Sequence, residues 1–367
     1  MTTAPRAALG ACLLLLAACA SRPPAAPPAA PAAVDEAPPL PPATRVAEAW
    51  ISADAGDEEL DSLATWQDED GRLWLVATAK RSERLLVFDA ATGARVREVG
   101  GPGREPGRFG RPNGIAVFGD LLFVVERGNR RVQVLSLPDF APLGSFGQEQ
   151  LRVPYGIWVY EHAPGEVTAL VTDSFMQDFD RGVPPPREQL SERVKRFRVR
   201  VDEDGALRVD YAGAFGDTGD GALWMVESIA GDLAGQRLLI AEEDHRVGST
   251  LREYALDGRY LGRSLPPLRG DAEGVALWEC EDGEGYWIAS EQLRPTRFHV
   301  HARGSLAPAG VFSGERTGIT DGLAVFAGAT ARFPGGALFA LHEDRAVAAF
   351  DLRDVARALR LSPRCGR

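Results

Sequence analysis

Lysine is almost missing from this chain of 367 residues: only Lys80 and Lys195 occur, and arginine carries the remaining positive charge. The net charge is −11, which argues against nucleic acid as a partner and favours cations. Histidine occurs only five times, and no paired-thiol motif is present. Any metal bound by this chain is therefore expected to be a hard cation held by oxygen atoms. Sustained helical periodicity is also missing, except in a last turn at 355–361, so a helix-rich fold is excluded.

The N-terminus has the pattern of an export signal. Arg6 supplies a positive charge, Leu13–Leu16 forms an apolar core too short to cross a membrane, and small residues follow. The segment Leu16-Ala17-Ala18-Cys19 resembles a lipobox, in which Cys19 is lipidated after cleavage. We expect an exported protein that touches the outer membrane or cell surface only through this lipid; an ordinary signal peptide is the alternative.

The rest of the chain divides by composition. Residues 1–19 are the predicted signal, and the Pro/Ala-rich stretch 20–44 is expected to form an extended tether. Residues 45–361 are expected to form the folded domain, with a tail at 362–367. Cys280 and Cys365 could form a disulfide in an oxidising compartment, but two unpaired cysteines are equally compatible with the sequence.

A tetrapeptide recurs six times in the predicted domain. It consists of any residue, then Gly or Ser, then an aliphatic residue, then Ala in five of the six copies. An apolar run ending in polar residues follows each copy, as in 73–80, 121–129 and 238–245. Short strands with turn signals at a period of roughly 45 residues predict an all-β, six-bladed β-propeller.

The tetrapeptide fits the first strand of a propeller blade, which lines the crowded central axis. Small residues fit there, and glycine also permits a sharp entry turn. Equivalent positions then lie on one ring, so the six lead residues are expected to face one mouth of the channel. They are Asp61, Asn113, Tyr155, Glu227, Glu273 and Asp321. Solvated turn residues are the simpler alternative, but carboxylates that converge repel one another unless a cation offsets them.

Calcium suits such a ring because it takes six to eight oxygen ligands. Further oxygen ligands are expected at the polar ends of the second strands, where the mouth would again be close. These are Glu242, Glu243, Asp244, Glu291, Glu343 and Asp344. An acidic run such as 242–244 can also be merely solvated, and it is the nearby ring that favours metal binding.

Six segments resemble the β-propeller phytases in their order and approximate spacing. They are 271–274 (DAEG), 240–244 (IAEED), 285–290 (GYWIAS), 320–322 (TDG), 153–156 (VPYG) and 111–113 (RPN). The resemblance covers about residues 58–350. It implies a six-bladed, calcium-dependent phosphomonoester hydrolase that binds several Ca²⁺ ions. Such an enzyme releases phosphate from inositol hexakisphosphate by attack of a metal-bound water.

The resemblance also implies roles for individual residues. Catalytic roles fall on Glu227, Glu273, Asp271, Asp321 and Tyr155. Metal ligation falls on Asp61, Glu227, Glu242, Glu243, Asp271 and Glu273, and we add Glu343 and Asp344 as further ligands. Phosphate binding falls on Lys80, Arg81 and either Arg127 or Arg130. The implied partner is a small phosphorylated molecule, and we expect a monomer.

Some segments depart from the phytase pattern and keep two alternatives open. Ser62 and Leu63 replace an acidic residue and a proline, and Asp173-Ser174 stands where the family often has lysine. Residues 99–147 resemble NHL repeats, whose propellers mostly bind partners without catalysis. The third possibility is a calcium-dependent lactonase or esterase of the gluconolactonase type, to which Asn113 in the ring would contribute.

Overall fold

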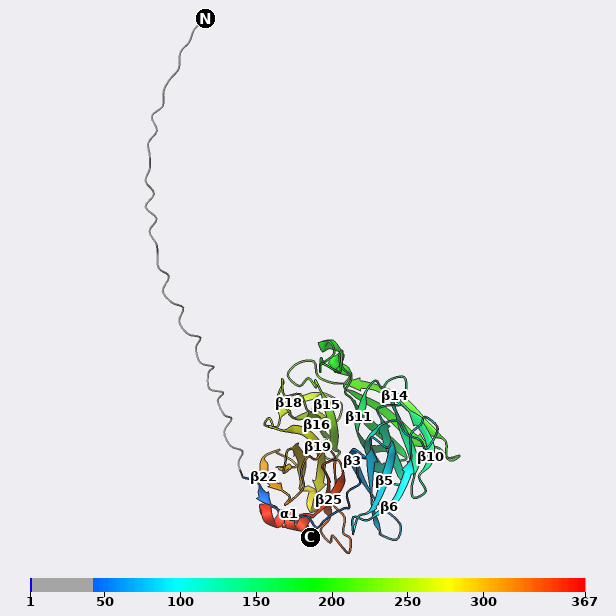
Figure 1. Ribbon diagram of the computed structural model, residues 1–367, viewed down its shortest axis with the longest axis vertical. Helices are drawn as coiled ribbons and strands as arrows, with labels where there is room; N and C mark the ends of the chain where they lie inside the picture. The colour runs from blue at the N-terminus through cyan, green and yellow to red at the C-terminus, as the bar shows by residue number, and fades with distance from the viewer. Residues whose placement is uncertain (2–41, 367) are drawn as a thin grey trace, which may run out of the picture. The chain divides into compact units, whose positions relative to one another are not determined.

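The repeated apolar runs are β-strands, and they form a six-bladed propeller in which five blades have four strands and blade 5 has a fifth at its edge (Figure 1). The structure is a computed structural model that describes Met1 and residues 42–366. The predicted export signal, Cys19 and most of the 20–44 tether lie outside the described residues. No helix in the described part of the chain is long and apolar enough to span a membrane.

Blades 1 to 3 are antiparallel sheets whose strands follow one another along the chain. Blade 1 contains β3 (Leu60–Gln67), β4 (Leu73–Ala79), β5 (Arg84–Asp89) and β6 (Arg95–Gly100). Blade 2 contains β7 (Pro112–Phe118), β8 (Leu121–Glu126), β9 (Arg131–Ser136) and β10 (Ala141–Phe146). Blade 3 contains β11 (Pro154–Ala163), β12 (Glu166–Asp173), β13 (Val194–Val201) and β14 (Leu207–Phe215), with the 3₁₀ helix η1 (Arg187–Glu192) between β12 and β13.

Blades 4 to 6 complete the ring. Blade 4 contains β15 (Val226–Asp232), β16 (Arg237–Glu242), β17 (Thr250–Ala255) and β18 (Tyr260–Ser264). Blade 5 contains β19 (Asp271–Glu279), β20 (Gly285–Gln292), β21 (Arg297–Ala302) and β22 (Pro308–Ser313), with η2 (Glu281–Gly283) between its first two strands. Blade 6 contains β23 (Leu323–Phe326), β24 (Ala337–His342) and β25 (Ala346–Asp351).

The N-terminal segment of the folded domain closes the propeller. Strand β2 (Trp50–Ile51) pairs antiparallel with β25 and becomes the outer strand of blade 6. Strand β1 (Thr44–Arg45) pairs parallel with β22 at the edge of blade 5. Because chain segments about 300 residues apart share these sheets, the ring cannot open without breaking strand pairs.

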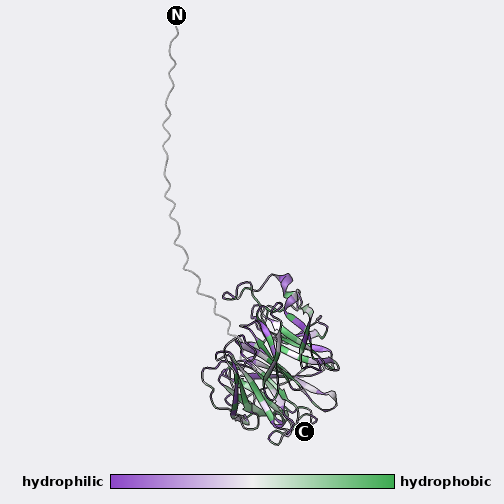
Figure 2. Ribbon diagram, turned by 90° about the vertical axis from the view of Figure 1, so that its right-hand side faces the viewer, coloured by the Kyte–Doolittle hydropathy of each residue, from purple (hydrophilic) through white to green (hydrophobic). Residues whose placement is uncertain are grey.

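The core consists of one hydrophobic cluster between each pair of neighbouring blades. Phe339 and Leu75, for example, pack between blades 6 and 1, and Phe123 and Phe197 between blades 2 and 3. Figure 2 shows the hydrophobic residues concentrated along the strands and the hydrophilic ones at the loops. Blade faces are therefore buried on both sides, which explains why the second strands are apolar almost throughout.

The C-terminus is fastened to blade 5. Helix α1 (Leu352–Leu359) is capped by the Asp351 side chain and overlaps the predicted last helical turn. Beyond it, Cys365 forms a disulfide with Cys280 across 85 residues. The pairing that the sequence left open is therefore present. By the loop-entropy account, such a bond stabilises the fold by about 4 kcal/mol.

Candidate metal centre

The tetrapeptide forms a β-bulge in the inner strand of blades 1 to 5. The pairing of inner and second strands skips between Leu60 and Leu63 in blade 1, and between Val226 and Ile229 in blade 4. A bulge redirects a side chain away from the sheet's alternation. The lead residue lies in this bulge, so its side chain is placed at the channel mouth instead of within a blade interface.

Glycine follows the lead residue because the neighbouring blade comes very close. A Cβ on Gly114 would lie 2.4 Å from the carbonyl oxygen of Tyr155, and one on Gly322 would lie 2.5 Å from that of Asp61. Neither glycine has a positive φ. The expectation that only small residues fit at the crowded axis is thus confirmed, whereas the sharp entry turn does not explain these glycines.

Hydroxyl groups of alternate second strands hold the ring's backbone. Thr78 donates to the carbonyl oxygen of Asn113 at 2.7 Å, and Thr172 to that of Glu227 at 2.8 Å. Each hydroxyl also accepts from the backbone N–H of its own blade's bulge. Inner strands of neighbouring blades are therefore joined directly beneath the ring, which fixes the lead residues relative to one another.

One part of the ring contains its own cation. Lys80 Nζ lies 2.7 Å from Asp61 Oδ1 and 3.7 Å from Asp321 Oδ2. Burial acts to lower the pKa of Lys80, but the charges of Asp61 and Asp321 raise it above its usual value. The amide of Asn113 lies 3.5 Å from Asp61, and Asp344 adds a further carboxylate near Lys80. We call Asp61, Lys80, Asn113, Asp321 and Asp344 the lysine half of the site.

The other part contains four carboxylates from blades 4 and 5, which we call the carboxylate half. Its members are Glu227, Glu243, Asp271 and Glu273. One oxygen each from Glu243, Asp271 and Glu273 lie within 4.8 Å of one another. Glu227 and Glu273 are buried, with 4% and 7% of their surface exposed. In the described part of the chain, no lysine or arginine forms an ion pair with any of the four.

The electrostatics of the carboxylate half require either protons or a cation. Desolvation, followed by repulsion from Glu273 and Glu243, raises the pKa of Glu227 well above its usual value. Desolvation and the neighbouring Asp321 and Glu243 do the same to the pKa of Glu273. Oε2 of Glu227 is buried and has no donor among the described residues. Glu227 therefore shares a proton with Glu243, unless a cation takes the proton's place.

Tyr155 lies among the charges of both halves. Desolvation and then Asp61, Glu227 and Glu273 raise the pKa of its phenol well above the usual value. The phenol therefore remains protonated at any physiological pH and can act as a hydrogen-bond donor. Oδ1 of Asn113 is buried and unpaired in the described structure, so it is a free acceptor in the ring, as is Oε2 of Glu227.

The carboxylates of Glu242 and Glu291 accept hydrogen bonds from backbone N–H groups. Glu242 accepts hydrogen bonds from the N–H groups of Trp224, Met225 and Asp244. Burial raises its pKa to about 7, and these bonds oppose that shift. Glu291 likewise accepts from Arg269 and Gly270 N–H. This position favours a structural role over the predicted metal ligation by Glu242.

The same position is acidic in two further blades, where Glu126 and Asp173 accept N–H groups of the loop before the inner strand. In four blades, an acidic residue at the end of the second strand therefore holds the loop before the inner strand. The polar ends of the second strands do face the ring's mouth, as expected, but most of them are occupied in holding loops.

The other acidic residues that were predicted as ligands have different partners. Glu343 forms an ion pair with Arg294, away from the carboxylate half. Asp344 has a buried, unpaired Oδ1 and belongs to the lysine half. Asp244 is held by a bidentate pair with the Arg246 guanidinium. Of the predicted metal ligands, only Glu227, Glu243, Asp271 and Glu273 come together without a lysine or arginine partner among the described residues.

The predicted phosphate-binding residues also differ from one another. Lys80 is engaged by Asp61 and Asp321, and Arg81 pairs with Asp57 and Glu59, each at 2.6 Å. Arg127 lies over the ring of Phe179, with 4.5 Å between its Cζ atom and the ring centroid. Arg127 and Arg130 form no ion pair with any described residue. Lys80 and Arg81 are therefore occupied in the absence of substrate.

Two site residues were missed from the sequence. His245 Nε2 lies 2.7 Å from Asp271 Oδ1, and Gln292 donates to Asp321 Oδ1. His245 follows the acidic run 242–244 and so lies near the predicted ligands in sequence. Nothing in the sequence marks Gln292 except its place after Glu291 at the end of a second strand.

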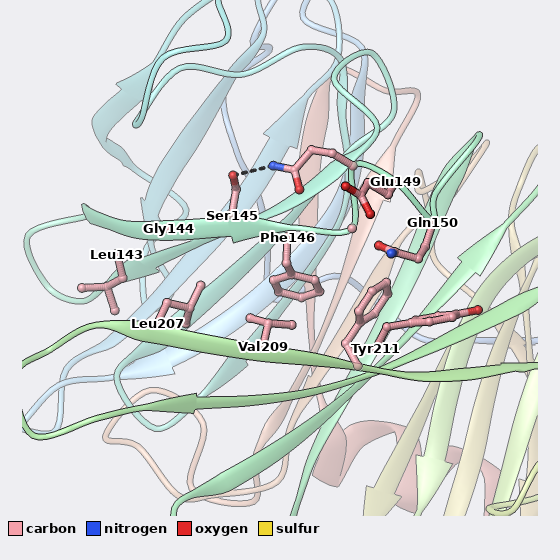
Figure 3. A pocket seen from close by; sticks show the side chains of 12 residues that line it. Leu143, Gly144, Ser145, Phe146, Glu149, Gln150, Leu207, Val209 and Tyr211 are labelled. Atoms are coloured by element: carbon pink, nitrogen blue, oxygen red, sulfur yellow. Dashed lines mark hydrogen bonds between the residues drawn. The ribbon is translucent and has the colours of Figure 1, made fainter.

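A separate hollow lies away from this site. It occupies about 560 Å³ between β10 and β14 and is shown in Figure 3. Its walls include Phe146, Leu207, Val209 and Tyr211, and Glu149 is the only acidic residue that lines it. Without converging charged groups, this hollow offers no catalytic chemistry, so the ring mouth is the stronger candidate.

Comparisons with known proteins establish the fold and leave the family open. No protein-family model matches this chain, and no curated protein matches its sequence. Among solved structures, hydrazine synthase of Kuenenia stuttgartiensis is similar over 85% of this chain and 82% of its own, at 14% identity and a TM-score of 0.49. A gluconolactonase of Xanthomonas campestris is similar over 85% and 98%, at 16% identity and a TM-score of 0.50. At such identity the likeness shows the propeller fold alone.

Proposed function

We propose that this protein is a divalent-metal-dependent hydrolase that acts on lactones or carboxylic esters at the carboxylate half of the ring. The observation that carries this proposal is the convergence of Glu243, Asp271 and Glu273 within 4.8 Å, beside buried Glu227 and with no lysine or arginine paired to them among the described residues. Repulsion of this kind is expensive in a stable fold unless it serves to bind a cation.

The donor set fits Ca²⁺ or a similar hard cation. All four side chains offer oxygen, and Glu227 Oε2 is a buried acceptor with no donor in the described structure. Glu227, Glu243, Asp271 and Glu273 would hold the ion. When bound, such an ion polarises a carbonyl oxygen and lowers the pKa of a water molecule.

Other side chains of the ring would position the substrate. The protonated phenol of Tyr155 can donate a hydrogen bond to a substrate oxygen, and Asn113 Oδ1 can accept one from a hydroxyl group. His245, bonded to Asp271, lies at the edge of the site and is more than half exposed, so it can exchange protons with solvent. Together these groups supply donors and acceptors around the carboxylate half.

We prefer lactones and carboxylic esters as substrates because Lys80 and Arg81 do not need a phosphate group to explain their presence. Both side chains form ion pairs with carboxylates of the chain, so a structural role accounts for them. The similarity in fold to a protein described as a gluconolactonase points the same way.

A phosphomonoesterase of the phytase type is the second candidate. It is favoured by Arg127 and Arg130, which lie on loops at the ring mouth and form no ion pair among the described residues. Its substrate would be a small phosphorylated molecule such as inositol hexakisphosphate. A propeller that only binds a partner is the outcome if neither activity is found.

We further propose that the protein is exported and anchored by lipid at Cys19. The disulfide between Cys280 and Cys365 supports an oxidising compartment. Mass spectrometry of the membrane fraction would detect the lipid on Cys19, and its absence would contradict the anchor.

The enzymatic proposal is tested with a substrate panel and Ca²⁺. We expect hydrolysis of δ-gluconolactone or p-nitrophenyl butyrate that is lost with a chelator and restored by Ca²⁺. Glu273→Gln should lower kcat/KM by about a thousandfold, the scale expected for loss of a metal-centred step. Release of phosphate from inositol hexakisphosphate, without lactone or ester hydrolysis, would instead establish the second candidate.

A matched control is Glu253→Gln, which changes a buried carboxylate of blade 4 that pairs with Arg237 and Arg263 away from the ring. It should leave the metal dependence of the activity unchanged. The absence of any metal-dependent hydrolysis across the panel would contradict the enzymatic proposal.

A further inference from the structure

The ring-side loops of blade 2 are basic, although the protein as a whole is acidic. Residues 101–111 lead into β7, and residues 127–130 follow β8, so both loops lie at the mouth that Asn113 faces. Arg127 N–H donates to the carbonyl oxygen of Arg111, which joins the two loops. Of their arginines, four form no ion pair with an acidic side chain in the described structure. We call Arg104, Arg108, Arg127 and Arg130 the basic face.

Acidic residues do little to neutralise the basic face. Glu105 is the only acidic residue within the two loops; its carboxylate accepts the backbone N–H of Arg104 and attracts the guanidinium of Arg108, so it offsets at most one of the four charges. Glu126, at the end of β8, is fully buried and faces inward. Arg111 is excluded from the basic face because it pairs with Glu59. Arg104, Arg108 and Arg130 are exposed, so their charges are available to a ligand.

A buried polar cluster holds the loop that carries Arg104 and Arg108. Arg131 donates to Glu126 at 2.5 Å and to the carbonyl oxygens of Arg104 and Arg108 at 2.7 and 2.9 Å.

The rest of the cluster secures the glycines of the same loop. Asn129 donates to the carbonyl oxygen of Gly103 at 2.8 Å, Gly107 N–H to Gln133 at 2.6 Å, and Gly110 N–H to Glu126 at 2.9 Å. The loop is therefore fixed in place before any ligand arrives. Preorganised cations lose little conformational freedom on binding an anion, which raises their contribution to affinity.

A loop of blade 3 contacts the basic face. The ring of Phe179, at the tip of the loop before η1, is stacked beneath the guanidinium of Arg127 and remains 53% exposed. The same tip is held from blade 4, because Arg246 donates to the carbonyl oxygen of Gly182. The loop thus spans from the basic face to the segment that carries Glu243.

We propose that the basic face binds a negatively charged group of the substrate, so that the hydrolase prefers anionic esters over neutral ones. This inference rests on the proposed function, since it names the substrate class of that site. Cations beside the ring would draw an anion toward a centre whose own carboxylates repel it. Such electrostatic attraction raises association rates by tenfold or more and weakens as salt is added.

The test compares two esters with similar acyl chains, p-nitrophenyl butyrate, which is neutral, and p-nitrophenyl hemiglutarate, which carries one carboxylate. We expect kcat/KM for the anionic ester to exceed that for the neutral one by about tenfold at low ionic strength. The ratio should fall toward one in 0.5 M NaCl and in the double variant Arg104→Gln/Arg130→Gln. The matched control is Arg259→Gln, an exposed arginine in the turn between β17 and β18 on the opposite face.

A binding measurement separates this inference from the hydrolase itself. The trisulfonated dye pyranine should bind the wild-type protein and Arg259→Gln at low salt, as measured by fluorescence anisotropy, and bind the double variant at least tenfold more weakly. Equal hydrolysis of the two esters would overturn the inference and leave the proposed function standing. If neither ester is hydrolysed, the dye decides: equal binding by wild type and double variant would overturn the inference.

Discussion

The two halves of the ring solve the same electrostatic problem in different ways. In the lysine half, Asp61 and Asp321 share the ammonium group of Lys80. In the carboxylate half, Glu227 and Glu273 are buried beside Glu243 with no lysine or arginine among the described residues to offset them. One half therefore has a counter-charge within the chain, whereas the other has none and needs protons or an external cation.

This difference distinguishes the ring carboxylates with a structural role from those that are candidates for function. A carboxylate with a built-in partner stabilises the fold and leaves little capacity for a ligand. A carboxylate whose pKa is raised because it lacks a partner is a candidate for binding or catalysis. Four lead carboxylates look alike in sequence, yet only those of blades 4 and 5 lack a lysine or arginine partner among the described residues.

The largest expected effect is a loss of stability of the metal-free protein as pH rises. The pKa values of Glu227 and Glu273 are raised by burial, and that of Asp321 is raised to about 8. Because the unfolded state releases these protons near pH 4, the metal-free protein should lose stability as pH rises from about 4 to 8. Each raised pKa unit is worth about 1.4 kcal/mol.

Calcium should remove most of this loss by replacing the protons of the carboxylate half. Thermal unfolding with Ca²⁺ or with chelator, from pH 5 to pH 8, measures it: the gain in Tm from Ca²⁺ should be larger at pH 8 than at pH 5. A gain that is zero, or equal at both pH values, would contradict a cation site at these carboxylates.

The second effect is on the lysine half. Lys80→Met removes its built-in cation and leaves Asp61 buried without a positive partner, which should cost about 3 kcal/mol of unfolding free energy. Adding Asp61→Asn should restore part of that stability, because it removes the uncompensated charge. Urea unfolding of both variants measures the change. If the single variant is as stable as wild type, the two halves do not differ as described.

Much of the fold was predictable because the repeat is carried by local pattern. The six copies of the tetrapeptide and the apolar second strands predicted six blades, and the structure confirms them. The lead residues were also placed correctly at one mouth. The need for small residues at the crowded axis was also predicted correctly, but the sharp entry turn was not, and the atoms that crowd Gly114 belong to Tyr155 of a neighbouring blade that the local sequence does not reveal.

The site was predictable only in its residue types. Whether a carboxylate is free depends on partners from distant parts of the chain: Lys80 reaches Asp321 across 241 residues of sequence. Glu242 and Glu243 are adjacent and identical in type, yet one accepts backbone N–H groups while the other faces Asp271 and Glu273. The direction in which a side chain leaves the end of a strand is set by the loop packed against it.

The smallest expected effect is the difference between substitutions of the adjacent residues Glu242 and Glu243. Glu242→Gln places an amide N–H group among the N–H groups of Trp224 and Met225, so it should cost about 1–3 kcal/mol of unfolding free energy and leave Ca²⁺ affinity within twofold of wild type. Glu243→Gln should do the reverse: Ca²⁺ affinity falls at least tenfold, and the metal-free protein is no less stable. Urea unfolding with chelator and calorimetric Ca²⁺ titration measure the two quantities. A loss of Ca²⁺ affinity in Glu242→Gln without a loss of stability would make Glu242 a ligand, as the sequence first suggested, and would move the boundary of the carboxylate half to include it.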